Sequence, residues 1–281
     1  MPSAKKPGII LAPYGSLYPR AIESYDRIRK TYENEFPSSP ILLAFTSQLM
    51  RTKLMEREGI RVLSPLAALA ELHEMGCKSA VVQSLHIVPG KEFHQIALLT
   101  QRLNDSGKLG FDHIGMGMPL LSGLDDCMKV SFALAAIREK GYANNEVAEN
   151  LTNPDKEAFL LVGHGTGHPA DSQYSMLAQV LKINHRNVFL GTLEGFPGIL
   201  DLMEELKSCG TKKVSLMPFL LVAGGHAEKD IASDDPASWK TILVKEGFEA
   251  SIQNCGMGDS QEIVSIFLGH TKKALERLKI K

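Results

Sequence analysis

The chain has 281 residues, of which 44% are hydrophobic and 22% charged, and 31 Lys and Arg against 32 Asp and Glu give a formal net charge of -1. This composition is typical of a globular protein with room for two lobes, and it excludes the basic excess of a nucleic-acid-binding or membrane-surface protein. No apolar run approaches the ~18 residues of a membrane span, and the run 9–12 is too short for a signal peptide. We therefore expect a cytoplasmic protein with neither a nucleic-acid nor a membrane partner.

Short apolar segments alternate with longer amphipathic segments along the chain. Most of the short segments are unbroken apolar runs, which is typical of strands covered by helices on both faces. Repeated strand–helix units predict parallel sheets with right-handed crossovers. The expected strands, in chain order, are Gly8–Pro13, Ile41–Phe45, Ser79–Gln83, Phe111–Gly115, Ala158–Gly163, Val188–Gly191, Lys213–Met217 and Glu249–Gln253.

Two of the intervening helices have recognisable start signals. Ser64 precedes Pro65, and Asp235 precedes Pro236. A capping residue followed by a first-turn proline is typical of a helix N-terminus. We therefore expect helices to begin at both places.

The second half of the chain repeats the first. The segment Ile9–Ser16 matches Phe159–Thr166, Gly76 matches Gly210, and a Gly-Met-Gly triplet occurs at 115–117 and again at 256–258. We interpret this as an internal duplication that produces two similar doubly wound (Rossmann-like) α/β lobes, each with a parallel four-stranded sheet. The lobes are expected at 1–142 and 143–281, with the polar, turn-rich segment 141–155 as linker and an active-site cleft between them.

Ligands of such sheets bind beyond the carboxyl ends of the strands, so the loops after strands are the place to look for chemistry. His164 lies between two glycines at the end of the fifth strand, and His226 follows two glycines after the seventh. Glycine permits sharp turns and close approach of a ligand. An imidazole there suits a metal ligand or a proton acceptor, and the alternative is a loop histidine beside a tight turn.

Two carboxylates follow strands in the same way. Glu194 comes after the sixth strand, and Glu92 comes after the third, opposite His226 in the repeat. Two imidazoles and one carboxylate form a ligand set that suits late first-row divalent ions and leaves coordination positions open. The alternative for either glutamate is a helix-start residue stabilised by the macrodipole. His86 either lines the pocket or packs in the core.

The glycine-rich segment 163–168 is not a nucleotide-binding loop. The third glycine of the dinucleotide fingerprint is replaced by His168, and no Gly-Lys-Ser/Thr ending follows. No Gly-x-Ser-x-Gly elbow occurs in the chain either, so a hydrolase triad has no nucleophile. We expect no nucleotide cofactor.

Three motifs in order resemble the ATP-independent class II tetrapyrrole chelatases, the family of the anaerobic sirohydrochlorin cobaltochelatase and a relative of the ferrochelatases. The motifs are Val162–Thr166, the segment from Gly224 through His226 to Ile231, and Leu85–Glu92. The similarity extends through nearly the whole chain.

The resemblance implies insertion of Co²⁺ into sirohydrochlorin without ATP, with iron or nickel as other candidate metals. By the same resemblance, His164 and His226 bind the metal and accept protons, and Glu92 or Glu194 completes the site. The first of these glutamates is placed with the catalytic residues and the second with the metal ligands, but the choice between them as ligand stays open. The tetrapyrrole is expected to contact Tyr14, Ser16, His86, Lys91 and Thr166, with Arg20 and Lys229 as further candidate cations.

Two other readings of the same ligands stay open. One is a carrier that binds a tetrapyrrole or a metal without turnover. The other is a hydrolase that uses metal-activated water. A homo-oligomer is compatible with either reading and with the chelatase.

Overall fold

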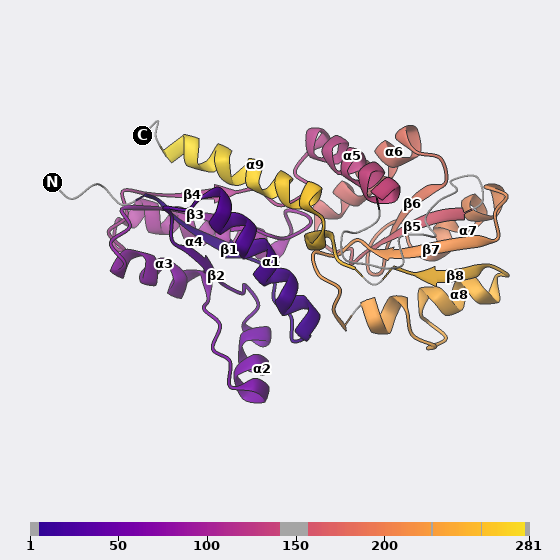
Figure 1. Cartoon of the computed structure of the whole chain (residues 1–281), viewed down its shortest axis with the longest axis horizontal. Helices are drawn as coiled ribbons and strands as arrows, with labels where there is room; N and C mark the ends of the chain where they lie inside the picture. The colour runs from indigo at the N-terminus through magenta and orange to yellow at the C-terminus, as the bar shows by residue number, and fades with distance from the viewer. Residues whose placement is uncertain (1–5, 141–156, 226, 254, 279–281) are drawn as a thin grey trace. The chain divides into compact units, whose positions relative to one another are not determined.

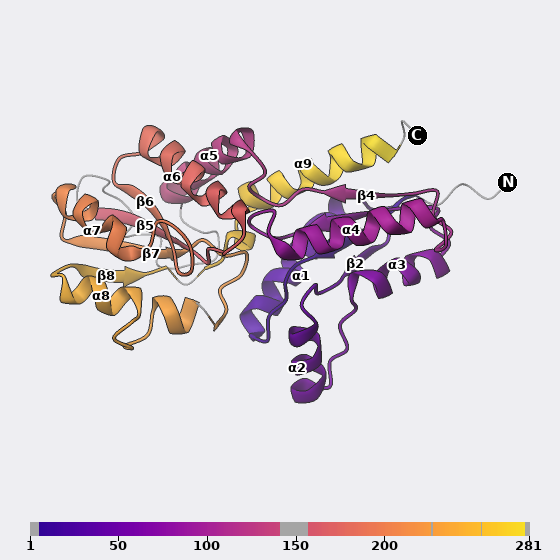
Figure 2. The same ribbon diagram turned by 180° about the vertical axis from the view of Figure 1, so that it is seen from behind.

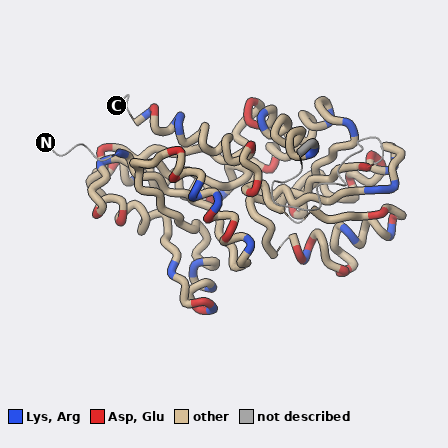
Figure 3. Tube along the Cα trace, viewed as in Figure 1, with Lys and Arg blue, Asp and Glu red and all other residues tan. Residues whose placement is uncertain are grey.

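The computed structural model describes residues 6–140, 157–225, 227–253 and 255–278, and Figure 1 shows their elements in chain order. The chain divides into two compact units, one made of Met1–Leu120 with Ser265–Lys281 and the other of Leu121–Val264. None of the described helices combines the length and the apolar character needed to cross a bilayer. Charges of both signs are interspersed along each unit (Figure 3).

The first unit is built on a parallel sheet with the strand order β2-β1-β3-β4. Every residue of β1 is buried, because helices cover both faces of the sheet, as the unbroken apolar runs predicted. The four strands are β1 (Gly8–Ala12), β2 (Ile41–Leu43), β3 (Ser79–Ser84) and β4 (His113–Gly117).

The helices of the first unit form two layers. On one face, Tyr32 Oη lies 3.1 Å from Thr271 Oγ1, and that hydroxyl donates to Gln83 Oε1 of β3 at 2.8 Å, so α1 and α9 share a face. Figure 2 shows α3 and α4 on the opposite face, where they bury an apolar cluster against the sheet. The helices are α1 (Pro19–Glu35), α2 (Gln48–Glu58), α3 (Pro65–Glu74), α4 (Lys91–Ser106) and α9 (Gln261–Leu278).

The second unit repeats this architecture with the strand order β6-β5-β7-β8. Helices α7 and α8 bury an apolar cluster against one face of its sheet, and α5 and α6 pack together, with Arg138 of α5 stacked over Phe159 of β5 at 5.8 Å. The elements are α5 (Leu124–Lys140), β5 (Glu157–Gly163), α6 (Ser172–Asn184), β6 (Val188–Thr192), α7 (Ile199–Ser208), β7 (Lys213–Pro218), α8 (Trp239–Lys245) and β8 (Glu249–Ile252).

The duplication extends to individual hydrogen bonds. The amide of Glu194 donates to the carbonyl of His164 at 2.8 Å, and the amide of Ser47 donates to the carbonyl of Tyr14 at 3.1 Å. His164 and Tyr14 are therefore equivalent, as the repeat predicted, and Ser47 occupies the position of Glu194. The eight expected strands are all present, with small differences at their ends.

One of the proposed sequence matches is wrong. The strand pairing aligns Ser79 with His113 in the first sheet and Lys213 with Glu249 in the second. In this register the glycine triplet 115–117 ends β4, whereas 256–258 follows β8 and enters a 3-10 helix, Met257–Asp259. The two triplets are therefore not equivalent, because the first lies inside a strand and the second lies in the loop after the corresponding strand.

The expected linker, 141–155, lies outside the described residues, and the two compact units differ from the expected lobes by two helices. α5 follows β4 in the chain but belongs to the second unit, and α9 follows β8 but belongs almost entirely to the first. The hydrogen bonds explain both placements: Ser131 of α5 lies 2.8 Å from His185 Nε2 at the end of α6, and His270 Nδ1 of α9 lies 3.0 Å from the carbonyl of Met118.

The two helix-start signals have different outcomes. Ser64 caps α3 by accepting from the amide of Ala67 at 3.2 Å, as expected. Asp235 does not begin a helix: its carboxylate accepts from the amide of Ala237 at 2.8 Å in a turn, and Ser238 caps α8. The second signal was wrong because Asp and Pro favour turns as strongly as helix starts.

Candidate functional site

His164 stands at the carboxyl end of β5, where its side chain is 37% exposed and therefore accessible to a ligand. Its Nδ1 lies 2.9 Å from the carbonyl oxygen of Gly165. Because a carbonyl can only accept, Nδ1–H is the donor, and the lone pair of the neutral ring is then on Nε2. A histidine oriented through one nitrogen in this way is the usual form of a metal-binding imidazole.

Glu194 lies beside His164. The amide of Leu193 donates to the carbonyl of Gly163 at 3.0 Å, and the amide of Glu194 donates to the carbonyl of His164 at 2.8 Å. These bonds join the loops after β5 and β6 and bring Glu194 Oε2 to 3.8 Å from His164 Nδ1. The structure therefore brings together an imidazole and a carboxylate that the sequence separates by a whole helix.

Gly165 permits the close approach of these two loops. Its φ is +76°, a left-handed conformation that side chains rarely adopt, and a Cβ there would collide with the backbone nitrogen of Gly195. A glycine is thus required at position 165 for two reasons, its backbone conformation and its small size.

Asp171 is hydrogen-bonded to the same two loops and was not predicted from the sequence. It ends a 3-10 helix, Pro169–Asp171, whose start His168 caps by accepting from the amide of Ala170. Asp171 Oδ1 accepts from the amide of Thr166 at 2.9 Å, and Oδ2 accepts from the amide of Phe196 at 3.0 Å. Its carboxylate therefore bridges the loop of His164 and the loop of Glu194.

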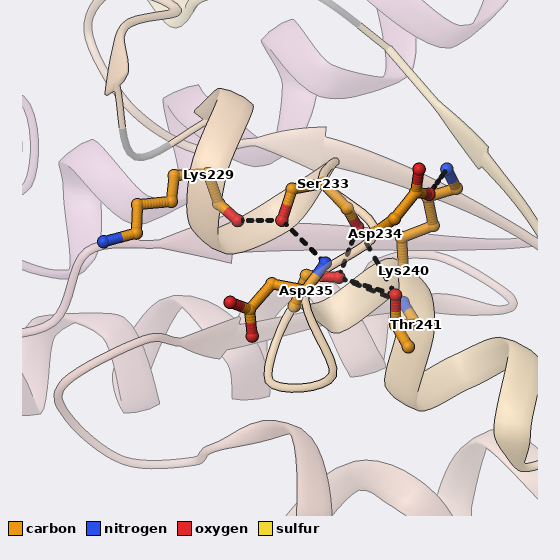
Figure 4. A network of polar contacts seen from close by, with 7 residues as sticks. Lys229, Ser233, Asp234, Asp235, Lys240 and Thr241 are labelled. Carbon is orange, nitrogen blue, oxygen red and sulfur yellow. Dashed lines mark hydrogen bonds and ion pairs between the residues drawn. The ribbon is translucent and has the colours of Figure 1, made fainter.

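His226 lies outside the described residues, but the segment after it is described. Residues Ala227–Ile231 form a π-helix, an element frequent at functional sites. Figure 4 shows how the chain beyond it is tied down: Ser233 Oγ donates to the carbonyl of Lys229 and accepts from the amide of Asp235. The Lys229 side chain extends away from this network in the picture.

The equivalent loops of the first unit hold Tyr14 and Ser16. Tyr14 is exposed, and Ser16 is buried with its Oγ accepting from the amide of Tyr18 at 3.3 Å. Thr166 is similar, because its Oγ1 accepts from the amide of His168 at 3.2 Å. The hydroxyls at both equivalent positions thus shape the turn in which they lie.

His86, after β3, has a hydroxyl partner at each ring nitrogen. Nδ1 lies 2.8 Å from Ser84 Oγ, and Nε2 lies 3.3 Å from Thr46 Oγ1. Burial lowers the pKa of His86 to about 4, although Glu92 acts in the opposite direction. This setting favours a neutral ring that is fixed in one orientation, in a residue that is only partly buried.

Acidification is expected to destabilise the protein through His86. Because its pKa is about 4 in the folded chain against an ordinary 6.5, the unfolded chain binds a proton between these pH values that the folded chain excludes. The contribution of His86 to stability is therefore complete above pH 6.5 and is lost as the pH falls towards 4, by at most about 1.4 kcal/mol per pH unit. Urea unfolding across this range measures the loss.

The variant His86→Gln should show a shallower dependence of the unfolding free energy on pH. Part of the slope is expected to remain, because burial also lowers the pKa of His185. His73→Gln is the matched control in the same unit, since His73 packs edge-on against Phe111. A slope in His86→Gln equal to that of the wild type would contradict the assignment.

Glu92 and Lys91 open α4. Lys91 is exposed, and Glu92 lies in the first turn of the helix, where the macrodipole stabilises a carboxylate. Glu92 belongs to the first unit, whereas His164 and Glu194 belong to the second. Among the described residues no three His, Cys, Asp or Glu side chains converge as a metal-binding group. The candidate site is built on His164 and Glu194, because their side chains lie 3.8 Å apart.

Comparison with known proteins reveals close relatives. The family model described as cobalt chelatase (CbiK) matches residues 7–276. The sirohydrochlorin cobaltochelatase CbiKC of Nitratidesulfovibrio vulgaris is 33% identical over 278 residues, which cover 99% of this chain and 93% of that protein. The sirohydrochlorin cobaltochelatase of Salmonella typhimurium is 33% identical over 239 residues, 85% of this chain and 84% of that protein.

Solved structures share the fold at lower identity. SirB from Bacillus subtilis with Fe³⁺ superposes with a TM-score of 0.67 at 13% identity, and 98% of each chain is covered. CbiX, described as the terminal enzyme of siroheme biosynthesis in denitrifying bacteria, has a TM-score of 0.57 at 16% identity, covering 95% of this chain and 99% of that one. The arrangement of two four-stranded parallel sheets is therefore that of these proteins.

Proposed function

The chain belongs to the cobalt chelatase family CbiK, and from this premise we propose that it inserts Co²⁺ into sirohydrochlorin for cobalamin biosynthesis. The observation that carries the proposal is the pair formed by His164 and Glu194, 3.8 Å apart at the carboxyl ends of two neighbouring strands. We propose that the enzyme is cytoplasmic and uses no nucleotide. Cobalt is the preferred metal substrate in this proposal, and iron and nickel are the alternatives.

In this proposal His164, Glu194 and His226 bind the metal ion. The donor set of two imidazoles and one carboxylate suits Co²⁺ and its neighbours in the first row. It also leaves coordination positions for the incoming pyrrole nitrogens, as a transfer site needs. Glu194 is preferred to Glu92 as the ligand, because it lies beside His164, whereas Glu92 occupies a helix start in the first unit.

Insertion exchanges two protons for one metal ion. The two pyrrole N–H bonds of the free-base macrocycle break, two metal–nitrogen bonds replace them, and both protons leave. Imidazole is the side chain best suited to proton transfer near neutral pH, so we propose that His164 and His226 accept these protons as the ion leaves them. We propose that Glu92 or Glu194 passes these protons outward, since a carboxylate beside an imidazole stabilises its protonated form.

The substrate carries many carboxylates, so cations and amide donors suit it better than an apolar slot. Exposed cations at helix starts fit this need: Lys91 is the first residue of α4, and Arg20 is the second residue of α1. We propose that the ring face contacts the exposed Tyr14. The other proposed contacts with the substrate are Ser16, His86, Thr166 and Lys229.

An anaerobic absorbance assay of Co²⁺ insertion into sirohydrochlorin tests the proposal. Turnover above the uncatalysed rate, with no added nucleotide, is the expected result. Tight binding of the tetrapyrrole or of Co²⁺ without turnover would identify a carrier instead. Absence of both binding and turnover would overturn the proposal.

A further inference from the structure

Asp171 is not one of the proposed metal ligands, but its hydrogen bonds connect the two loops that carry His164 and Glu194. Its two carboxylate oxygens accept from two different loops, at 2.9 Å from the amide of Thr166 and 3.0 Å from the amide of Phe196. Thr166 lies two residues after His164, and Phe196 lies two residues after Glu194. His164 and Glu194 are therefore each followed, two residues later, by an amide that this carboxylate holds.

The packing around Asp171 leaves its carboxylate little freedom. The side chain is partly buried, and a Cβ added to Gly195 would collide with both of its oxygens. Hydrogen bonds that backbone amides donate to a charged carboxylate are also stronger than those between neutral groups. The carboxylate thus acts as a rigid spacer between the two loops.

The first unit provides an internal comparison. Its equivalent loops carry Tyr14 in place of His164 and Ser47 in place of Glu194. Tyr25 is hydrogen-bonded to the backbone of Gly15, and Tyr174 is hydrogen-bonded to the backbone of Gly165. These equivalent bonds align the sequence of α1 with that of α6.

In this alignment the position of Asp171 falls on Ala21 or Ile22, neither of which is acidic. The loop after β2 is held instead by Arg51, whose Nη1 donates to the carbonyl of Thr46 at 3.1 Å. The paired loops can therefore fold without a carboxylate at this place. Such a carboxylate occurs in the unit that has the histidine and the glutamate.

We infer that Asp171 is a positioning residue that sets the spacing of His164 and Glu194 and, through it, the affinity for the metal. This inference rests on the proposed function, because it assumes that these two side chains are the ligands. Asp171 touches neither the metal nor the substrate in this role. Its effect is that of an outer partner of a metal site, whose loss costs about 10- to 100-fold in metal affinity.

Titration of the whole chain with Co²⁺ alone, followed by its visible absorption, measures this effect. Asp171→Asn places an amide N–H₂ against one of the two backbone amides, so it should weaken Co²⁺ binding by about 10- to 100-fold and change the absorption bands. Gly195→Ala should do the same while keeping the charge, since the new methyl group displaces the carboxylate.

Asp126→Asn is the matched control. Asp126 lies in the same unit and accepts a backbone bond, from the amide of Ser122 at 3.2 Å. An asparagine can still accept that bond through Oδ1, so this variant removes a carboxylate charge but should keep the affinity and the spectrum of the wild type. Melting temperatures of all variants separate a local change from general destabilisation. Equal loss of affinity in Asp126→Asn and Asp171→Asn would overturn the inference.

His164→Ala distinguishes failure of the inference from failure of the proposed function. If His164→Ala abolishes Co²⁺ binding while Asp171→Asn and Gly195→Ala keep the wild-type affinity and spectrum, only the positioning role is wrong. If the wild type does not bind Co²⁺, or binds it no better than His164→Ala, the proposed metal site itself is wrong.

Discussion

Replacement of His164 by alanine is expected to lower the rate of Co²⁺ insertion by roughly 10²- to 10⁴-fold, the range associated with loss of a positioned proton acceptor. Two roles are proposed for the same imidazole: Nε2 binds the ion first, and it accepts a pyrrole proton only after the ion has passed to the macrocycle. The ring is also held by Gly165 and lies 3.8 Å from Glu194, so solvent cannot replace it in the same geometry. The measurement is single-turnover absorbance with sirohydrochlorin and Co²⁺ under anaerobic conditions.

His226→Ala should lower the rate by a similar factor, and the double variant should be little slower than either single one, because the two residues act as a unit. His94→Ala is the control, since His94 is an exposed histidine of α4 whose Nδ1 lies 2.9 Å from the carbonyl of Gly90. Circular dichroism should show an intact fold in all variants. Turnover that survives both His164→Ala and His226→Ala would mean that the site lies elsewhere.

Glu194→Gln is expected to weaken Co²⁺ binding by at least about 100-fold, the upper end of what loss of an outer partner costs. The substitution keeps the size of the side chain and the backbone bond from its amide to the carbonyl of His164, but it removes the charge. A neutral amide is a poorer ligand for a divalent ion than a carboxylate. Calorimetric titration with Co²⁺ measures the affinity directly.

Glu92→Gln is the decisive comparison, because the sequence left the two glutamates as alternatives. We expect this variant to retain the affinity of the wild type for Co²⁺, since Glu92 lies in the first turn of α4, where a carboxylate is stabilised by the helix macrodipole. A lowered insertion rate with unchanged affinity would assign Glu92 to proton transfer. A loss of affinity in Glu92→Gln with none in Glu194→Gln would reverse the assignment of the metal ligand.

Local sequence patterns were enough to predict the strands and their duplication. Most of the strands are short, unbroken apolar runs next to a turn signal, and such runs are formed by residues that are neighbours in the chain. The equivalence of Tyr14 and His164 could also be read directly, because insertions do not separate the two copies at that point. The positions of His164 and Glu194 at strand ends followed from the same local patterns.

Which of these residues lie side by side depends on long-range packing, which local patterns do not specify. Glu194 reaches His164 because β5 and β6 are parallel neighbours and their loops exchange backbone hydrogen bonds. Asp171 had no local signal at all, since a carboxylate that accepts from two loops is recognised only when both loops are in place. The match between the triplets at 115–117 and 256–258 failed for the same reason: strand register depends on pairing partners.

The assignment of α5 and α9 to the units was likewise beyond the sequence. Each of these helices ends its repeat and buries one face, and nothing in its sequence identifies the sheet that it covers. The choice depends on contacts between residues far apart in the chain, such as Thr271 with Gln83 and Ser131 with His185. A local pattern specifies that a helix buries one face. Long-range packing determines which sheet that face packs against.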